Sequence, residues 1–248
     1  MKRVWDINCD LGEGESAART GALMRSVTSA NVACGGHAGD LVSMRRCVLL
    51  AAKHGVRLGA HPGPWDRANF GRGRVQITPS ELELLLLQQV GVLQSLAREK
   101  DVPLHHVKLH GGLYHAVEDS SRLAHVYLET LTRHWPGCLA YAKAGGKVVA
   151  AAARVRGAKV WGEGFIDRGY LSDGGLVPRD TPGALIESRK ALEMRLEDLC
   201  MRGRVTAVSG EPLPIALRTL CVHGDTPSAL RLLEWAVAWM NSHRLRFP

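Results

Sequence analysis

Residues 6–13 read Asp-Ile-Asn-Cys-Asp-Leu-Gly-Glu, and this stretch has the pattern of a buried strand. In a β-strand successive side chains point to opposite faces, so Asp6, Asn8 and Asp10 share one face and the apolar residues between them share the other. The apolar face is suited to packing against helices. If the sheet closes into a ring, the three polar side chains point inward, toward the axis of a barrel.

Short apolar segments alternate with longer helical patterns along the rest of the chain. The strands we predict are residues 4–11, 29–34, 56–60, 106–110, 139–142, 158–162 and 219–223, and the helices are residues 41–54, 79–100, 122–135, 145–155, 184–201 and 227–244. Thr78-Pro79 followed by Glu81 is a capping box with proline at the first helical position, and Thr226-Pro227 is interpreted as a similar helix start. About seven strand–helix repeats predict a parallel sheet, open or closed.

Composition places the chain among ordinary globular proteins of one domain, residues 1–248. It has 46% hydrophobic and 23% charged residues, and a net charge of +8. Aromatic residues are 5% and do not alternate with the basic ones, which favours a solvated basic surface over a nucleic-acid interface. The charge also suits an anionic substrate or an acidic partner. Six cysteines without a C-x-x-C pair, no signal peptide and no long apolar run predict a cytoplasmic protein that binds no membrane.

Almost every predicted strand ends in polar residues next to glycine. These residues are Asp10, Asn31, His37, His61, Lys108, His110, Glu163, Asp167, Arg168, His223 and Asp225. Parallel α/β proteins place their active sites at the carboxyl ends of the strands, so we expect these side chains to meet. The glycine-rich segment 162–181 is longer than most loops in a compact domain, which is typical of a functional loop, and it contributes Arg179.

Each of these residues also has a purely structural interpretation. A histidine at a strand end is often only hydrogen-bonded, Asp40 and Asp225 are suited to capping helices, and Lys108 is suited to an ion pair with Asp6 or Asp10. The joint pattern favours function, because buried charges are costly unless they are paired or used.

The chain resembles the LamB/YcsF family, which is the family of the A subunit of 5-oxoprolinase. The matching segments are residues 6–13, 29–40, 59–63, 70–72, 107–114, 163–170, 173–183 and 220–227. The resemblance implies an irregular seven-stranded TIM-like (βα) barrel, ATP-dependent opening of 5-oxoproline to glutamate, and assembly with 5-oxoprolinase subunits B and C. The chain departs from the family pattern by a shorter segment between Glu13 and Thr28, at Gly36, Gly73 and Leu109, and in residues 64–69.

Opening an amide requires a base, a water molecule and a group that stabilises the oxyanion. We predict Asp10 as the base, or as a ligand of a divalent metal ion together with His61 and His110. The alternative is that these histidines act as acid, base or substrate-binding groups without a metal. Lys108 is predicted to hold a substrate carboxylate or phosphate, or to stabilise the oxyanion.

The remaining candidates are assigned to substrate binding or to a second proton transfer. Arg168 and Arg179 are suited to clamping a carboxylate, with Glu163 and Asp167 as the groups that orient them. His223 is a further catalytic acid or base, with Asp225 as its orienting group or as a helix cap. Asn31 and His37 are assigned to substrate binding.

The sequence leaves several questions of function open. No G-x-x-x-x-G-K-[ST] loop and no G-x-G-x-x-G motif after a strand is present, so either this chain binds ATP in an unfamiliar way or a partner protein binds it. The alternatives to the 5-oxoprolinase subunit are a stand-alone metal-dependent amidase or deacetylase, and a non-catalytic substrate-binding subunit. Self-association is compatible with the sequence and is not determined by it.

Overall fold

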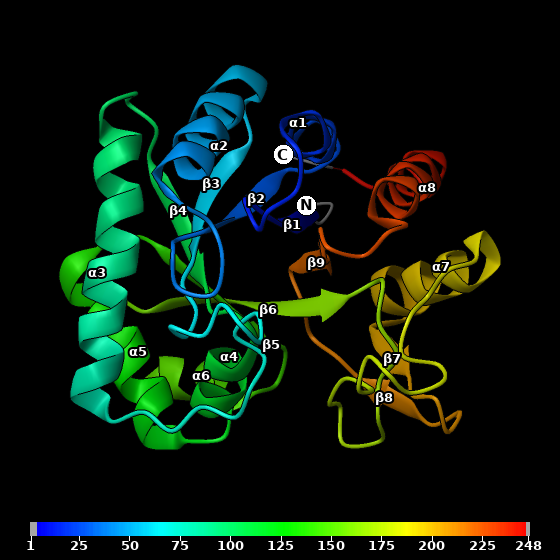
Figure 1. The fold of residues 1–248 in the computed structure, drawn as a ribbon. Helices are drawn as coiled ribbons and strands as arrows, with labels where there is room; N and C mark the ends of the chain where they lie inside the picture. The colour runs from blue at the N-terminus through cyan, green and yellow to red at the C-terminus, as the bar shows by residue number, and fades with distance from the viewer. Residues whose placement is uncertain (1–3, 247–248) are drawn as a thin grey trace.

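Seven parallel strands close into a barrel in the order β1-β2-β3-β4-β5-β6-β9 (Figure 1). The computed structural model describes residues 4–246. The barrel strands are β1 (Asp6–Leu11), β2 (Ser29–Ala33), β3 (Arg57–His61), β4 (Leu104–Lys108), β5 (Leu139–Lys143), β6 (Lys159–Phe165) and β9 (Thr219–Val222). Closure is direct, because β1 pairs with β2 on one side and with β9 on the other. The predicted seven-stranded TIM-like barrel is confirmed.

Helices surround the barrel on its outside (Figure 1). They are α1 (Ala17–Met24), α2 (Leu41–His54), α3 (Pro79–Arg98), α4 (Gly111–Glu118), α5 (Ser121–His134), α6 (Lys147–Ala151), α7 (Arg189–Leu196) and α8 (Ala229–Ser242). Helix α2 has the predicted bounds, because Asp40 and Ser43 cap its start reciprocally and Gly55 ends it with a left-handed φ of 65°. The predicted capping box of Thr78 and Glu81 opens α3.

Several predicted bounds are wrong for identifiable reasons. Strand β4 ends at Lys108, so His110 lies beyond it as the N-cap residue of α4, a helix that begins with two glycines and was not predicted. Helix α8 begins at Ala229 and not at Pro227, because the Thr226 hydroxyl donates to Asp167 instead of capping the helix. The single helix predicted for residues 184–201 is a loop followed by α7 and a π-helical turn, Glu197–Arg202.

Residues 166–218, which we call the arm, leave the barrel between β6 and β9. The arm contains the long loop, α7, and the two-stranded antiparallel sheet of β7 (Arg204–Thr206) and β8 (Pro212–Pro214). In Figure 1 it forms a separate lobe beside the barrel. The Asp198 carboxylate accepts hydrogen bonds from Thr206 and Arg204 and thereby fastens β7 to the π-helical turn.

The barrel interior is polar, as the alternation in β1 predicts. Ile7, Cys9 and Leu11 are at most 1% exposed and belong to the apolar core, whereas Asp6 and Asn8 lie in a buried hydrogen-bond network. The Asp6 carboxylate accepts hydrogen bonds from hydroxyl groups of four residues: Thr28, Ser29, Tyr141 and Thr219. This network satisfies the buried carboxylate, which would otherwise be costly. Within residues 4–246 we find no helix that combines the length and the apolar character needed to cross a bilayer.

Candidate functional site

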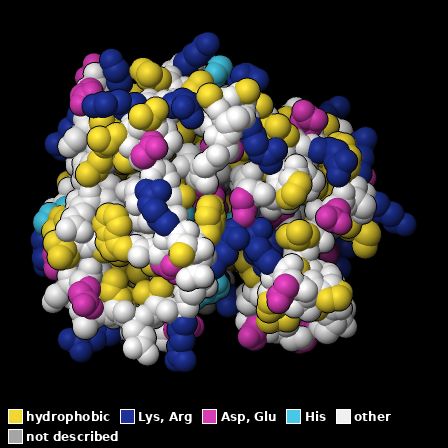
Figure 2. Space-filling view, viewed as in Figure 1, with side chains coloured by type: hydrophobic (Ala, Val, Ile, Leu, Met, Phe, Trp, Pro, Cys, Tyr) yellow, Lys and Arg dark blue, Asp and Glu magenta, His cyan; other side chains and the backbone are white. Residues whose placement is uncertain are grey.

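A cavity of about 970 Å³ opens at the carboxyl ends of the strands, between the barrel and the arm. Figure 2 shows the groove between these two parts, with Lys and Arg side chains gathered at its edge. Of the predicted site residues, those that line the cavity are Asp10, His61, Lys108, His110, Glu163, Arg168, Arg179 and His223. The lining does not include Asn31, His37, Asp167 or Asp225, and His37 lines a second, smaller cavity. The structure therefore brings eight of the twelve predicted site residues to one mouth.

Lys108 lies at the centre of the mouth and is 3% exposed. Its ammonium lies 2.9 Å from Asp10 Oδ1, 3.1 Å from Glu163 Oε2 and 3.0 Å from the sulfur of Cys221. Burial lowers the pKa of Lys108, but electrostatic interactions with Asp10, Cys221 and Glu163 outweigh it, so the pKa lies well above its ordinary value. Lys108 is thus a buried, charged ammonium group directed at the cavity.

The two carboxylates that flank Lys108 differ in their acidity. Burial raises the pKa of Asp10, but electrostatic interactions with His61, Lys108 and His223 outweigh burial and bring the pKa well below its ordinary value. Burial raises the pKa of Glu163, and the charge of Lys108 offsets this only in part. Glu163 Oε1 has no hydrogen-bond partner among residues 4–246. Asp10 is therefore the ionised base candidate, and Glu163 is the more readily protonated neighbour.

Asn31, on the neighbouring strand β2, donates a hydrogen bond to Asp10. Its amide nitrogen lies 2.7 Å from Asp10 Oδ1 and 2.7 Å from Asn8 Oδ1, and its amide oxygen accepts a hydrogen bond of 2.6 Å from His106 Nε2. His106 was not among the predicted site residues, although it shares the inward face of β4 with Lys108. Both ends of the Asn31 amide are thus engaged inside the barrel, which suits a positioning role.

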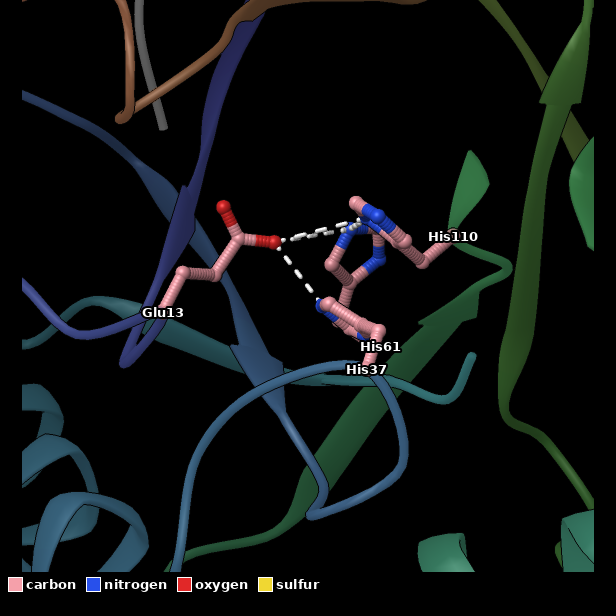
Figure 3. Close-up of side chains that lie close together, drawn as sticks. All are labelled: Glu13, His37, His61 and His110. Atoms are coloured by element: carbon pink, nitrogen blue, oxygen red, sulfur yellow. Dashed lines mark hydrogen bonds and ion pairs between the residues drawn. The ribbon is translucent and has the colours of Figure 1, made fainter. Parts of the chain in front are cut away.

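Four side chains from four different loops and strand ends form a cluster beside Asp10: Glu13, His37, His61 and His110 (Figure 3). Glu13 Oε1 lies 3.0 Å from His37 Nε2, 3.4 Å from His110 Nδ1 and 3.7 Å from His61 Nε2. The candidate ligand atoms of the four residues all lie within 4.8 Å of one another, a spacing that can hold a metal ion. We refer to these four residues as the imidazole–carboxylate cluster.

Glu13 is a site residue that the sequence analysis missed as a functional group. Gly12 adopts a left-handed φ of 75°, which turns the chain sharply after β1. The Glu15 carboxylate fixes the turn by accepting hydrogen bonds from the backbone N–H groups of Gly12 and Glu13. The signal was present in the sequence as an acid directly after a strand-end glycine.

Burial keeps the three imidazoles uncharged. It lowers the pKa of His61 to about 3, that of His110 to about 3 and that of His37 to about 2. One nitrogen of each of two rings is also engaged by the backbone. His61 Nδ1 lies 2.8 Å from the carbonyl oxygen of Lys108, and His110 Nε2 lies 2.8 Å from that of Phe70.

His223 is oriented by Asp167 and not by Asp225 as predicted. Its Nδ1 atom lies 3.0 Å from Asp167 Oδ2, and its backbone N–H donates to the same oxygen. Burial raises the pKa of Asp167, but the charge and hydrogen bonds of His223 outweigh it and lower the pKa below its ordinary value. The predicted helix-cap role of Asp225 is also absent, because Ser228 is the N-cap residue of α8 and no side chain caps that position.

Asp225 instead joins two arginines from opposite sides of the mouth. It forms ion pairs with Arg72 and, at 3.2 Å, with Arg179. Arg168 is 6% exposed and donates hydrogen bonds to the carbonyl oxygens of Val177 and Ala184, which shapes the long loop. Arg72, which the sequence analysis did not select, therefore stands beside Arg179 where a clamp of Arg168 and Arg179 was predicted.

Comparisons with known proteins agree with the architecture. The model of the LamB/YcsF family matches residues 5–247. The A subunit of 5-oxoprolinase from Pyrococcus furiosus is 41% identical over 233 residues, which cover 93% of this chain and 91% of that protein. The protein of the same name from Syntrophobacter fumaroxidans is 41% identical over 230 residues, which cover 92% and 90%.

Two solved structures resemble the fold. The lactam utilization protein of Thermus thermophilus superposes with a TM-score of 0.89 at 30% identity and covers 98% of both chains. A family 4 carbohydrate esterase from Streptomyces lividans gives a TM-score of 0.50 at 9% identity, covering 99% of this chain and 92% of its own, and it shares the fold alone. The family match and the identity to the curated relatives run over nearly the whole length, so the chain belongs to the LamB/YcsF family.

Proposed function

We propose that the chain is the hydrolytic subunit of an ATP-dependent 5-oxoprolinase, which opens 5-oxo-L-proline to L-glutamate. The observation that carries the proposal is the buried triad of Lys108, Asp10 and Glu163 at the mouth of the barrel. The relatives named as the A subunit of 5-oxoprolinase support the substrate, because they cover most of this chain. ATP consumption by a complex with subunits B and C, a divalent ion at the mouth and a cytoplasmic location belong to the same proposal.

The chemistry requires activation of a stable amide. A five-membered lactam is resonance-stabilised, so transfer of the terminal phosphoryl group of ATP to the amide oxygen, with release of ADP, makes the ring carbon electrophilic. One water then adds to that carbon and the carbon–nitrogen bond breaks, with a proton delivered to the nitrogen. A second water releases inorganic phosphate, which leaves the carboxylate of glutamate.

The residues of the mouth suit the hydrolytic steps of this reaction. Asp10 is ionised and held in place, so it accepts the proton of the attacking water. The Lys108 ammonium stabilises the oxyanion of the tetrahedral intermediate. His223, oriented by Asp167, faces the same cavity and delivers the proton to the departing nitrogen.

The arginines at the rim suit the substrate carboxylate. Arg72 and Arg179 both point at Asp225, so an anion entering the cavity meets two guanidinium groups that one carboxylate already holds in place. Arg168 orders the loop that carries Arg179. The sequence predicted that Arg168 binds the substrate carboxylate directly. In the proposal Arg168 instead supports the loop that carries Arg179.

The imidazole–carboxylate cluster favours a second candidate, a metal-dependent amidase that acts without ATP or partners. The experiment that separates the two measures glutamate released from 5-oxoproline by the purified chain, with and without subunits B and C and with and without ATP. Each mixture is run in metal-free and in metal-replete buffer.

Release that requires ATP and both partners supports the 5-oxoprolinase. Amide hydrolysis by the chain alone, without ATP, supports the amidase. A complex that keeps full activity when Asp10 and Lys108 are replaced by alanine would contradict the hydrolytic role proposed here and favour a non-catalytic role in substrate binding.

A further inference from the structure

We propose that Glu13 Oε1, His61 Nε2 and His110 Nδ1 bind one divalent metal ion, and that His37 orients the carboxylate. The three binding residues come from separate parts of the chain: the turn after β1, the end of β3 and the residue before α4. Figure 3 shows their polar ends directed at one point. The expected ion is one that accepts mixed nitrogen and oxygen ligands, such as Zn²⁺, Co²⁺ or Mn²⁺.

The hydrogen bonds of the two histidines determine which nitrogens are available. A backbone carbonyl only accepts, so His61 must donate from Nδ1 to Lys108 and His110 must donate from Nε2 to Phe70. The remaining nitrogens, His61 Nε2 and His110 Nδ1, face each other at 3.0 Å. They cannot both carry hydrogen at that distance, and two lone pairs beside a carboxylate oxygen repel unless a positive charge lies between them.

The spacing fits an ion better than a single shared proton. Ligand atoms held at about 2.0–2.2 Å from one ion lie roughly 2.9–3.6 Å apart in octahedral or tetrahedral arrangements. The distances among these atoms are 3.0 and 3.4 Å, which lie within this range, and 3.7 Å, which lies just above it. A proton shared by the two nitrogens would contact only two of these atoms, whereas an ion contacts all three.

The surroundings of the three ligands also match a metal centre. Metal-binding histidines generally donate their second ring N–H to a carbonyl or a carboxylate, as both His61 and His110 do. His37 stacks on the His110 ring at 3.6 Å with planes 4° apart, and its Nε2 atom lies 3.0 Å from Glu13 Oε1. His37 is therefore placed to fix both a ligand ring and the ligand carboxylate.

A second group of candidate metal ligands lies nearby, but the ammonium group of Lys108 already occupies the space between two of them. Asp10, Cys221 and His223 also lie close together, but the Lys108 ammonium contacts both Asp10 and Cys221. Asp10 Oδ2 lies 3.6 Å from His61 Nε2 and so stands next to the proposed ion site. The predicted set of Asp10, His61 and His110 thus keeps its two histidines and takes Glu13 as the carboxylate.

The cluster separates two cavities. His61 and His110 line the main cavity, whereas Glu13 and His37 line a second cavity of about 400 Å³ on the other side. An ion held here would act as a Lewis acid toward a ligand in the main cavity. This Lewis-acid role rests on the proposed function, whereas the binding of the ion does not. The experiment below therefore measures binding in the absence of substrate.

The experiment titrates the purified full-length chain, after treatment with a chelator, with Co²⁺, Zn²⁺ and Mn²⁺. Binding is followed by calorimetry and, for Co²⁺, by the visible absorption of the bound ion. The variants H61N and H110Q are informative because each retains an amide N–H near the position that donates to the backbone and removes the ligand nitrogen. E13Q removes the anionic oxygen, H37Q tests the orienting role, and H125Q is the control on an exposed histidine of α5.

We expect one ion per wild-type chain and a rise of the thermal unfolding midpoint with ion concentration. E13Q, H61N and H110Q should each lose more than about 100-fold in affinity, H37Q about 10- to 100-fold, and H125Q nothing measurable. Wild-type chain that binds none of the three ions at micromolar concentrations overturns the proposal, whatever the variants do, and indicates a shared proton instead. Unchanged affinity in folded H61N and H110Q overturns it as well, with folding checked by circular dichroism.

Discussion

The Nζ atom of Lys108 lies 2.9 Å from Oδ1 of Asp10, and each of the two side chains is 3% exposed. Coulomb attraction between buried groups is strong, but it offsets the cost of burying them only when both partners are present. The pair joins β4 to β1 across the interior of the barrel, so it connects the stability of the fold with the chemistry at its mouth.

Replacing Lys108 with methionine should impair both stability and activity. Asp10 and Glu163 would remain buried without their counter-charge, which costs about 3–5 kcal/mol of unfolding free energy. The loss of the proposed oxyanion partner should lower kcat of the proposed complex by about 100- to 1000-fold. Urea unfolding and steady-state glutamate release measure the two effects. The exposed Lys100 provides the control, K100M, and an active K108M complex would contradict the role given to Lys108.

Asp10 and Asp6 lie on the same face of β1 but should respond differently to replacement by asparagine. D10N preserves the shape of the side chain and removes the proposed base, so kcat should fall by about 100- to 10,000-fold with little change in KM. Asp6 lies at the other end of the strand, where four hydroxyl groups donate to its carboxylate. D6N should therefore lower the free energy of unfolding by about 1–3 kcal/mol. Comparing kinetics with chemical denaturation for both variants checks this. Equal losses of kcat in the two would contradict a special role for Asp10.

The arginine pair at the rim should affect binding more than turnover. R179M and R72M each remove one guanidinium group from the entrance, so KM for 5-oxoproline should rise about 10-fold while kcat changes little. R74M, on an exposed arginine of the same loop as Arg72, should behave like wild type. The measurement is the dependence of the initial rate on 5-oxoproline concentration. A fall of kcat with unchanged KM would instead place these arginines in the chemical step.

The arm should be stabilised by Asp198 in a pH-dependent way. Burial raises the pKa of Asp198, but hydrogen bonds from Thr206, Arg204 and Arg202 outweigh it and lower the pKa below its ordinary value. A carboxyl whose pKa is lowered in the folded state contributes stability above its unfolded pKa of about 4 and loses it as the pH falls through the folded value.

D198N should therefore reduce the free energy of unfolding by about 1 kcal/mol at pH 7, a modest figure because the Arg202 and Arg204 side chains are 49% and 40% exposed and solvent screens their charges. The difference from wild type should shrink toward pH 3. Urea unfolding at both pH values tests this, with E187Q as the control on an exposed acid of the arm. A difference that persists at low pH would show that the carboxylate charge is not its cause.

The convergence of Asp10, His61, Lys108 and His110 could be predicted because it follows from topology alone. Parallel strands end at the same edge, so residues at strand ends meet wherever the ring closes. The inward face of β1 was likewise predictable. Polar and apolar residues alternate over its six positions, and in a strand such alternation places all the polar side chains on one face.

The missed features depend on contacts between residues far apart in the sequence, or on turns fixed by such contacts. Glu13 joins the cluster only because Gly12 takes a left-handed conformation that Glu15 fixes from outside the strand. Asp167 reaches His223 across 56 positions, whereas the nearer Asp225 is drawn away by two arginines. The two strands of the arm are each three residues long and β8 contains two prolines, so neither periodicity nor propensity indicates this sheet.

Closure of β1 against β9 also determines where the ends of the chain lie. The backbone N–H of Trp5 donates to the carbonyl oxygen of Arg246 at 2.8 Å, next to a parallel bridge between Val4 and Arg246. This junction lies at the floor of the barrel, at the amino end of β1, and the cavity lies at the opposite end. A spectroscopic probe attached at Val4 or Arg246 would therefore sit away from the entrance and leave the rim unobstructed.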